Sequence, residues 1–469
     1  MPPATGPAGP AAGAGARLSA QRWALALSAA ASFLVVLDAL VVATALTSIG
    51  RDLGSSLGGL EWTVSAYTLS FAVLLLTGAA LGDMLGRRRV FAAGLALFAV
   101  ASAACALAPS VGVLIAARAV QGAGAAAIMP MALALLNMAF PPHRRGRAIG
   151  MYGSITSVAV VLGPVLGGAV TQGLGWQWVF WVNVPVALAA VPLVLTRLAE
   201  PPRPGATIDV PGVLLAVVAA LGLAWGLIRG NEAGWGSAQT IGAFVTGAVA
   251  AVAFGAWERR AAAPMLPPRL LRSRALAAGN VAIFALNGSL TVVVFLMPQF
   301  QQVVSGQDPL GAGLRLLPWG IAPFLLASPA GALADRIGAR SLSVAGLAVQ
   351  AAAVAWLAAV VTPSVGYGAL VAPIATSGVG LAIAIPSLTR SATSTTPLAD
   401  VGKASGAFST MRQLGGAFGV AIGGAAFAAA GAITSPQAFS DGFRAGLVVA
   451  AALAFAGLIA AVALPGRSG

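Results

Sequence analysis

The chain has 469 residues, of which 59% are hydrophobic and 8% charged, and its mean hydropathy is +0.92. Because ordinary soluble domains carry about 25% charged residues, this composition excludes a soluble protein and indicates an integral membrane protein. The net charge of +14 does not indicate nucleic-acid binding, since the arginines form short clusters between apolar runs instead of one solvated patch.

The chain opens with a segment rich in proline, glycine and alanine, and apolar runs follow it. We expect residues 1–22 to form a disordered cytoplasmic tail, because they lack the basic start of a secretory signal followed by an apolar stretch. A helix needs about 20 apolar residues to cross a bilayer. The sequence offers fourteen such runs, at residues 23–49, 61–82, 89–108, 111–138, 147–171, 178–196, 210–228, 239–257, 275–303, 312–333, 341–361, 367–389, 403–431 and 442–464.

Positive residues accumulate in alternate loops, as expected for cytoplasmic loops of a membrane protein. With the N-terminus inside, 20 of the 26 basic residues are cytoplasmic and two lie within spans. The remaining four are external, namely Arg51, Arg229, Arg315 and Arg444. The charge pattern therefore predicts an even number of spans, with both termini in the cytoplasm. We expect the chain to lie in the plasma membrane.

Two cytoplasmic stretches rich in proline and arginine, at 197–209 and 258–274, bracket the seventh and eighth spans. These two spans carry no charge at mid-membrane depth. We therefore predict an all-α integral membrane protein with fourteen transmembrane helices in three parts. They are a six-helix bundle at 23–200, an inserted two-helix linker at 201–260 and a second six-helix bundle at 261–469.

One acidic residue, Asp38, lies in the middle of the first apolar run. A charged group at this depth costs roughly 2.5 to 3.5 kcal/mol, which normally makes it face a cavity or the bundle interior. Arg118 lies within the fourth run and needs an acid or water, so we expect the first and fourth helices to pair through these residues. Burial favours a neutral carboxyl group and a nearby guanidinium favours an ionised one. The balance predicts a proton site at Asp38, with a purely structural ion pair as the alternative.

The loops after the second and tenth spans share one pattern. Each has an acid at the helix end, a glycine three residues later that allows a left-handed turn, and basic residues beyond it. The first copy has Asp83, Gly86 and Arg87, and the second has Asp335, Arg336, Gly338 and Arg340. A repeated device in corresponding loops of two halves indicates internal duplication.

These loops resemble motif A of the major facilitator superfamily, although the first copy has Ala79 and Met84 at positions where glycine and arginine are usual. The segment from Arg118 to Ala125 is similar to motif B. The fifth span is similar to motif C, the antiporter motif, at Gly163, Pro164, Gly167 and Gly168. The runs Trp176–Pro185, Leu37–Leu46 and Met411–Gly416, the last with Arg412 and Gln413, are similar to segments of the fourteen-helix drug:proton antiporter family.

The resemblance implies the major facilitator fold and a proton-coupled antiporter that exports small amphiphilic drugs, antibiotics or metabolites by alternating access. It also implies that Asp83 and Arg87 latch the cytoplasmic side, with Asp335 and Arg340 as the copy in the second half. Two alternatives remain open. One is a proton symporter that imports a nutrient, and the other is a transport-inactive membrane receptor or scaffold.

Polar residues inside the spans are candidates for contacts with substrate, or for contacts between helices. They are Tyr67, Gln121, Tyr152, Asn280, Asn287, Gln299 and Gln302. The thirteenth span has no acid, which favours neutral or monocationic substrates. We read Glu61 and Trp62, at the outer start of the second span, as anchors at the membrane interface.

Other classes of membrane protein find no support in the sequence. The only lysine, in Gly402-Lys403-Ala404, does not fit the phosphate loop of an ATP-driven pump. One histidine, His143, and one mid-membrane acid cannot supply an enzyme site or a metal site. We therefore expect no enzyme activity, cofactor, metal or nucleic-acid partner. We expect a bacterial monomer whose partners are protons, lipid and a small molecule.

Overall fold

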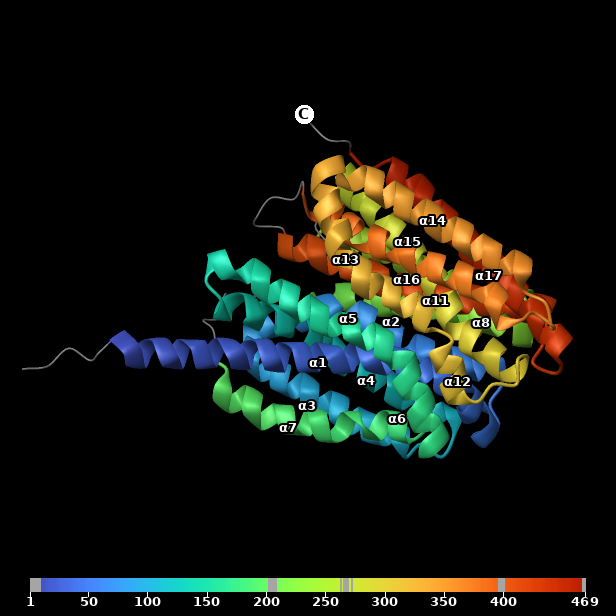
Figure 1. The fold of residues 1–469 in the computed structure, drawn as a ribbon, viewed down its shortest axis with the longest axis horizontal. Coiled ribbons are helices and arrows are strands. Elements are labelled where there is room, and N and C mark those ends of the chain that lie inside the picture. Colours follow the sequence, from blue (N-terminus) through green and yellow to red (C-terminus); the bar gives the residue numbers. More distant parts are fainter. Residues whose placement is uncertain are drawn as a thin grey trace, which may run out of the picture.

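The computed structural model describes residues 10–200, 209–261, 264, 270, 273–394 and 401–465. Within this part of the chain the regular elements are all helices, and fourteen segments are long and apolar enough to span a membrane. Both the all-α class and the fourteen predicted spans are confirmed. The helices of the two halves run side by side, blue to green in one layer and yellow to red in the other (Figure 1).

The first six spans form one bundle in which α4 packs against both α2 and α3, and α1 packs against α5. Its core is a cluster of buried side chains that includes Tyr67, Phe71, Phe91 and Phe98. The helices are α1 (Pro10–Asp52), α2 (Leu57–Leu85), α3 (Arg87–Ala106), α4 (Val111–Ala139), α5 (Pro142–Gly173), α6 (Trp178–Trp181) and α7 (Asn183–Arg197).

The last six spans form a second bundle, in which α11 packs against α16 and α17, and α14 packs against α15. Glycines four residues apart on α16 allow this close approach. Gly415, Gly419 and Gly423 face Phe284, Gly288 and Val292 of α11. The helices are α11 (Arg274–Val303), α12 (Pro309–Leu314), α13 (Leu317–Ile337), α14 (Ala339–Val360), α15 (Tyr367–Ser394), α16 (Val401–Ala430) and α17 (Pro436–Val462).

The inserted pair consists of α8 (Val210–Ala233) and α9 (Ala238–Glu258), which pack against each other. Helix α8 also packs against α2 of the first bundle and α16 of the second. The contact surface includes Leu69, Ala220, Ala224 and Ala417, a set that we call the seam cluster. The inserted pair therefore touches both halves and is more than a connection between them.

Three predicted boundaries differ from the structure. The sixth span is divided into α6 and α7, and the tenth into α12 and α13. The first helix begins at Pro10, so the prediction of a disordered tail was wrong for residues 10–22. The run Ala11–Ala16 is rich in alanine, the strongest helix former, and proline is tolerated at the first helical position. Residues 1–9 lie outside the described part.

Candidate functional site

Asp38 lies near the middle of α1, 14 residues before its end at Asp52. At 1.5 Å per residue this is about 21 Å along the helix. Its side chain is 1% exposed. A carboxylate at this depth is stable only if surrounding groups replace the hydrogen bonds of water.

Three side chains supply those hydrogen bonds. Arg118 Nη1 of α4 donates to Asp38 Oδ2 at 2.5 Å. Gln121 Nε2, one turn further along α4, and Asn183 Nδ2 of α7 each donate to Asp38 Oδ1 at 2.8 Å. The predicted pairing of the first and fourth helices is present, and three donors surround the carboxylate, as its ionised form requires.

The guanidinium of Arg118 is satisfied in turn. Its Nη1 also donates to Gln121 Oε1 at 2.7 Å, and its Nε donates to the carbonyl oxygen of Thr63 on α2 at 3.2 Å. The guanidinium carbon lies 4.2 Å from the centre of the Tyr67 ring, within the range of a cation–π contact. Gln121 completes the network by donating to Ser102 Oγ of α3 at 2.8 Å.

This group, which we call the Asp38 cluster, joins helices α1, α2, α3, α4 and α7. Its side chains are all nearly inaccessible to solvent, with Arg118 at 1% exposure. Because a buried ion pair loses several kcal/mol when one partner is removed, neutralising Asp38 would release the charge of Arg118 and disturb all five helices. Protonation of the carboxylate would neutralise Asp38 reversibly.

Tyr67 and Gln121 were predicted to line the substrate cavity, and the structure places both in the Asp38 cluster instead. Asn183 was not predicted as a site residue. It is the one side-chain amide in the apolar run Trp178–Arg197, and a lone amide inside a span could have been noticed for its need of a polar partner. Thr63 acts through its backbone carbonyl, and no residue type could have indicated it.

The glycines of the fifth span lie at two contacts, one with α1 of the same half and one with α12 of the other half. A Cβ at Gly163 would lie 2.7 Å from Leu40 Cβ, and Gly167 packs against the backbone of Val41, so both let α5 approach α1. Gly168 packs in the same way against the backbone of Pro309 at the start of α12.

The reciprocal contact is made by Gly313 of α12, which packs against the carbonyl of Pro164. Two hydrogen bonds also cross between the halves. Gln302 Nε2 donates to the carbonyl of Thr44 at 3.1 Å, and Gln172 Nε2 donates to Asp308 Oδ2 at 3.1 Å. On the topology predicted from the charges, these contacts lie at the outer ends of α1, α5, α11 and α12, and they close that end of the boundary between the halves.

Glu61 belongs to the same outer contact. It is 3% exposed, and a Cβ added at Gly424 of α16 would collide with its carboxyl group. The prediction that Glu61 anchors the chain at the membrane interface was therefore wrong, since its side chain faces α16. A residue at the first turn of a span can face either lipid or a neighbouring helix, and the sequence alone does not distinguish these two environments. Gln302, a predicted cavity residue, likewise serves the outer contact.

The first motif A loop is held within its own half. Arg87 Nε donates to Asp83 Oδ1 at 2.9 Å, one turn away. Gly86 has φ +107°, a conformation that other residues rarely adopt, and a Cβ there would lie 2.8 Å from Glu200 Oε1. The backbone N–H of Arg88 donates to the same oxygen at 3.2 Å. Glu200, which sequence reasoning missed, thus ties the loop to the end of the sixth span.

The second motif A loop repeats the backbone conformation. Gly338 has φ +96°, matching Gly86, so both loops turn through a glycine with positive φ as predicted. Arg340 is exposed at the start of α14. The side chains of Asp335 and Arg336 lie outside the described part, as does that of His143.

Three of the other predicted residues, Tyr152, Asn287 and Arg412, lie within candidate membrane spans. Tyr152 of α5 donates through its hydroxyl to Ser32 Oγ of α1 at 2.7 Å. Asn287 Nδ2 of α11 donates to the carbonyl of Arg412 at 2.7 Å. Arg412 lies within α16, 11 residues from its start.

Three predicted polar residues remain, namely Asn280, Gln299 and Gln413. Asn280 is 5% exposed, and its Oδ1 has no hydrogen-bond partner among the described residues. Gln299 donates to the carbonyl of Phe295 in its own helix at 2.8 Å. Gln413, beside Arg412, is partly exposed.

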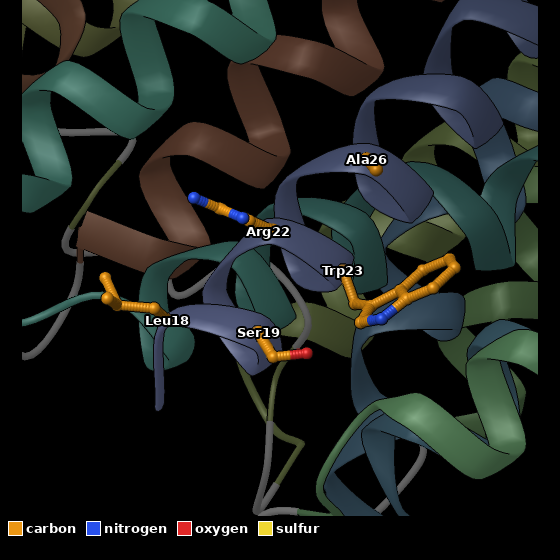
Figure 2. Close-up of a pocket in the computed structure, with 5 residues that line it drawn as sticks. All are labelled: Leu18, Ser19, Arg22, Trp23 and Ala26. Atoms are coloured by element: carbon orange, nitrogen blue, oxygen red, sulfur yellow. The ribbon is translucent and has the colours of Figure 1, made fainter. Parts of the chain in front are cut away.

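A cavity of about 530 Å³ borders the N-terminal part of α1. Its described lining is Leu18, Ser19, Arg22, Trp23 and Ala26, all from this helix, and Arg22 and Trp23 project to different sides of it (Figure 2). Arg22 precedes Asp38 by 16 residues, about 24 Å along a helix. The cavity therefore lies away from the Asp38 cluster, at the end of α1 that the charge pattern predicts to be cytoplasmic.

Sequence comparison places the chain among transporters. The sequence model of the Major Facilitator Superfamily matches residues 28–419 and 278–468. The cephamycin export protein CmcT of Amycolatopsis lactamdurans is 37% identical over 406 residues, which cover 85% of this chain and 83% of that protein. The tetracenomycin C resistance and export protein of Streptomyces glaucescens is 33% identical over 459 residues, which cover 96% and 85%.

A third relative, the multidrug resistance protein Stp of Mycobacterium tuberculosis (strain CDC 1551 / Oshkosh), is 35% identical over 399 residues, covering 85% of this chain and 74% of that protein. Among solved structures, a bacterial homologue of the human lysosomal transporter Spinster, in an inward-facing and unoccupied conformation, has a TM-score of 0.65 at 16% identity, covering 95% of this chain and 98% of the other. This last similarity supports the fold.

Proposed function

Since the chain belongs to the major facilitator superfamily, we propose that it is a proton-coupled efflux transporter that exports small amphiphilic compounds in exchange for protons. Relatives that share more than 30% of its residues over most of its length are named for the export of cephamycin and tetracenomycin C and for multidrug resistance. These names support export as the direction of transport.

The observation that carries the coupling proposal is the Asp38 cluster. Asp38 is an acid in the middle of a span whose carboxylate is held by Arg118, Gln121 and Asn183 from two other helices. A proton on this carboxylate would remove its charge and leave the Arg118 guanidinium without a counter-ion. The protonated and ionised forms therefore favour different packing of the first bundle, which is the requirement for coupling.

The two halves supply the second requirement, an alternation of access. The contacts of α5 with α12 join the halves at the end that the charge pattern predicts to be outside, and we propose that this arrangement belongs to the inward-facing state. Reaching the outward-facing state needs these contacts to separate as one bundle rocks against the other. In the cycle that we propose, protonation of Asp38 from outside precedes the return to the inward-facing state, and its deprotonation to the cytoplasm precedes substrate binding.

The entry of one proton per cycle supplies enough free energy for export. A proton that moves inward through about 100 mV releases roughly 2.3 kcal/mol, and each pH unit adds about 1.4 kcal/mol. Keeping a hundredfold concentration gradient of a neutral substrate needs about 2.7 kcal/mol. One Asp38 therefore supports substantial accumulation outside the cell, and the transporter needs no cofactor.

The proposal is tested in a bacterial host that lacks its own exporters. Cells that express the protein should accumulate less puromycin, cephamycin or tetracenomycin C than cells without it, and an uncoupler should abolish the difference. Export that survives the uncoupler would exclude a proton-driven mechanism, and accumulation above the control would indicate import. The same cells, fractionated, should hold the protein in the plasma membrane with both termini on the cytoplasmic side.

A further inference from the structure

Three hydrogen-bond donors line the cavity beside the N-terminal part of α1. They are the hydroxyl of Ser19, the guanidinium of Arg22 and the indole Nε1 of Trp23, and Leu18 and Ala26 complete the described lining. Within the described part of the chain, none of these three donors forms a hydrogen bond, and Arg22 forms no salt bridge. The cavity therefore offers a positive charge and two neutral donors that contacts within the protein leave unused.

The five lining residues occupy one side of α1. A helix turns by about 100° per residue, so these positions fall within about 140° of one another. The bulky side chains of Leu18 and Trp23 lie at the two edges of this sector, and Ser19, Arg22 and Ala26 lie between them (Figure 2). The cavity thus has apolar edges and a guanidinium, which suits a molecule with an apolar chain and an anionic group.

A second guanidinium lies beside the cavity. The guanidinium carbon of Arg197, at the end of α7, lies 5.3 Å from the centre of the Trp23 ring, within the range of a cation–π contact. The acid that follows it most closely in the chain, Glu200, forms a salt bridge with Arg88 at 3.7 Å instead. Two cations therefore meet around Trp23, and neither forms a salt bridge among the described residues.

The cavity lies at the depth of lipid headgroups. Arg22 precedes Asp38 by 16 residues, about 24 Å along the helix axis. With Asp38 near the middle of the membrane and a tilt of about 20°, Arg22 lies at the headgroup layer, which ends about 20 to 22 Å from the midplane. Tryptophan is enriched at this layer, and Trp23 lies there on the side that the charge pattern predicts to be cytoplasmic.

We propose that this cavity binds an anionic phospholipid of the cytoplasmic leaflet. Its phosphate accepts hydrogen bonds from Arg22, whose guanidinium matches a phosphate in geometry and charge. Arg197 adds a second positive charge, and the acyl chain lies against the apolar edges. Basic pockets on the cytoplasmic side of transmembrane helices bind such headgroups.

The bound lipid also connects two helices of the Asp38 cluster. Trp23 belongs to α1, which carries Asp38, and its ring contacts Arg197 of α7, which carries Asn183. Asn183 donates to the carboxylate of Asp38 at 2.8 Å. A lipid held at Arg22 and Arg197 therefore stabilises the packing of α1 against α7, and it should raise the melting temperature of the protein.

The test uses the purified full-length protein in detergent and native mass spectrometry, which resolves each bound lipid and gives its dissociation constant. Phosphatidylglycerol is compared with phosphatidylcholine of the same acyl chains. An arginine near an anionic headgroup changes affinity roughly fivefold. Arg22→Gln and Arg197→Gln should each weaken the binding of phosphatidylglycerol by about that factor and leave phosphatidylcholine unchanged, whereas Arg22→Lys should keep most of the affinity.

The matched control is Arg89→Gln, which removes an exposed arginine at the start of α3, on the same predicted side but outside the cavity lining. It should bind phosphatidylglycerol as the wild type does. Equal losses in Arg22→Gln and Arg89→Gln would overturn the proposal, because they would indicate diffuse attraction by the net charge of +14. Retained binding of phosphatidylcholine and an unchanged melting temperature without added lipid show that the variants are folded.

Two further outcomes would also overturn the proposal. One is a wild type that binds the two lipids equally. The other is displacement of phosphatidylglycerol by glycerol 3-phosphate or by puromycin, which would assign the cavity to a soluble anion or to a transported compound. We expect neither to compete, because neither carries acyl chains.

Discussion

The side-chain amide of Asn183 donates a 2.8 Å hydrogen bond to the carboxylate of Asp38, linking the sixth span to the first. The other two donors, Arg118 and Gln121, both come from α4. Asn183 therefore adds a donor from α7 to the same oxygen, Oδ1, that Gln121 of α4 contacts. This makes the position of α7 sensitive to the charge on Asp38.

Replacing Asn183 by leucine removes one donor and leaves the carboxylate with two. Since hydrogen bonds to charged groups contribute roughly 1.5 to 3 kcal/mol, we expect Asn183→Leu to lower the thermal stability of the purified protein measurably and to slow transport at least tenfold. Gln437→Leu is a matched control, because it removes an amide that contacts the carboxylate of Asp441 at the exposed start of α17. It should change stability by less than about 0.5 kcal/mol. Equal effects of the two substitutions would contradict the role given to Asn183.

We predict that a larger side chain at Gly168 shifts the protein away from the conformation with the closed outer side. A Cβ at this position would lie 2.7 Å from Leu310 Cα of the opposite half, so Gly168→Val should destabilise the closed outer side by roughly 1 to 3 kcal/mol. Spin labels at Leu174 and Gln437, exposed outer residues of the two halves, should then report a larger population of long distances. Gly150→Val is the control on the same helix, since nothing lies within 4 Å of its Cβ position. An unchanged distance distribution in Gly168→Val would show that α5 and α12 do not form the outer closure.

We predict that transport depends on the positive φ of Gly86 in the first motif A loop. Alanine at φ +107° is strained by roughly 1 to 3 kcal/mol, and its Cβ would also displace the carboxylate of Glu200. We expect Gly86→Ala to reduce transport strongly, and Glu200→Gln to reduce it less, because the amide oxygen still accepts from the N–H of Arg88. Gly112→Ala, with nothing within 4 Å of the added atom, should have no effect. Normal transport by Gly86→Ala would contradict the claim that the loop needs glycine at this position.

The seam cluster predicts a functional role for the inserted helices. Ala224 is fully buried where α8 meets α2 and α16, so Ala224→Leu should separate these helices and lower stability by roughly 1 to 3 kcal/mol. The matched change Ala251→Leu, at an exposed position of α9, should be neutral. If both variants melt and transport like the wild type, α8 is only a passive link between the halves.

The fold could be predicted from the sequence because hydrophobic length and the distribution of arginines report directly on the membrane. The pairing of Asp38 with Arg118 could also be predicted, since each is a mid-membrane charge of opposite sign and a charge in hydrocarbon needs a partner. The turns at Gly86 and Gly338 could be predicted as well, because glycine adopts a backbone conformation with positive φ more easily than other residues.

Other features could not be predicted because they depend on distances between helices. Gln302 and Glu61 were candidates for the cavity and the membrane interface, yet both lie at the closed outer side, and only the relative tilt of the bundles decides this. Glu200 follows the sixth span in a proline-rich stretch where no periodicity indicates a partner. That Arg412 has no salt bridge among the described residues could be seen only once the neighbouring helices were placed in three dimensions.

The central claim is that Asp38 is the group that carries the proton, and its most direct test is proton movement in proteoliposomes. A pH-sensitive dye inside the vesicles should report proton movement when a substrate is added to the wild type. The Asp38→Asn variant should show no such movement, because the amide keeps the size of the side chain without a proton to release. Proton movement in Asp38→Asn equal to that of the wild type would contradict the account.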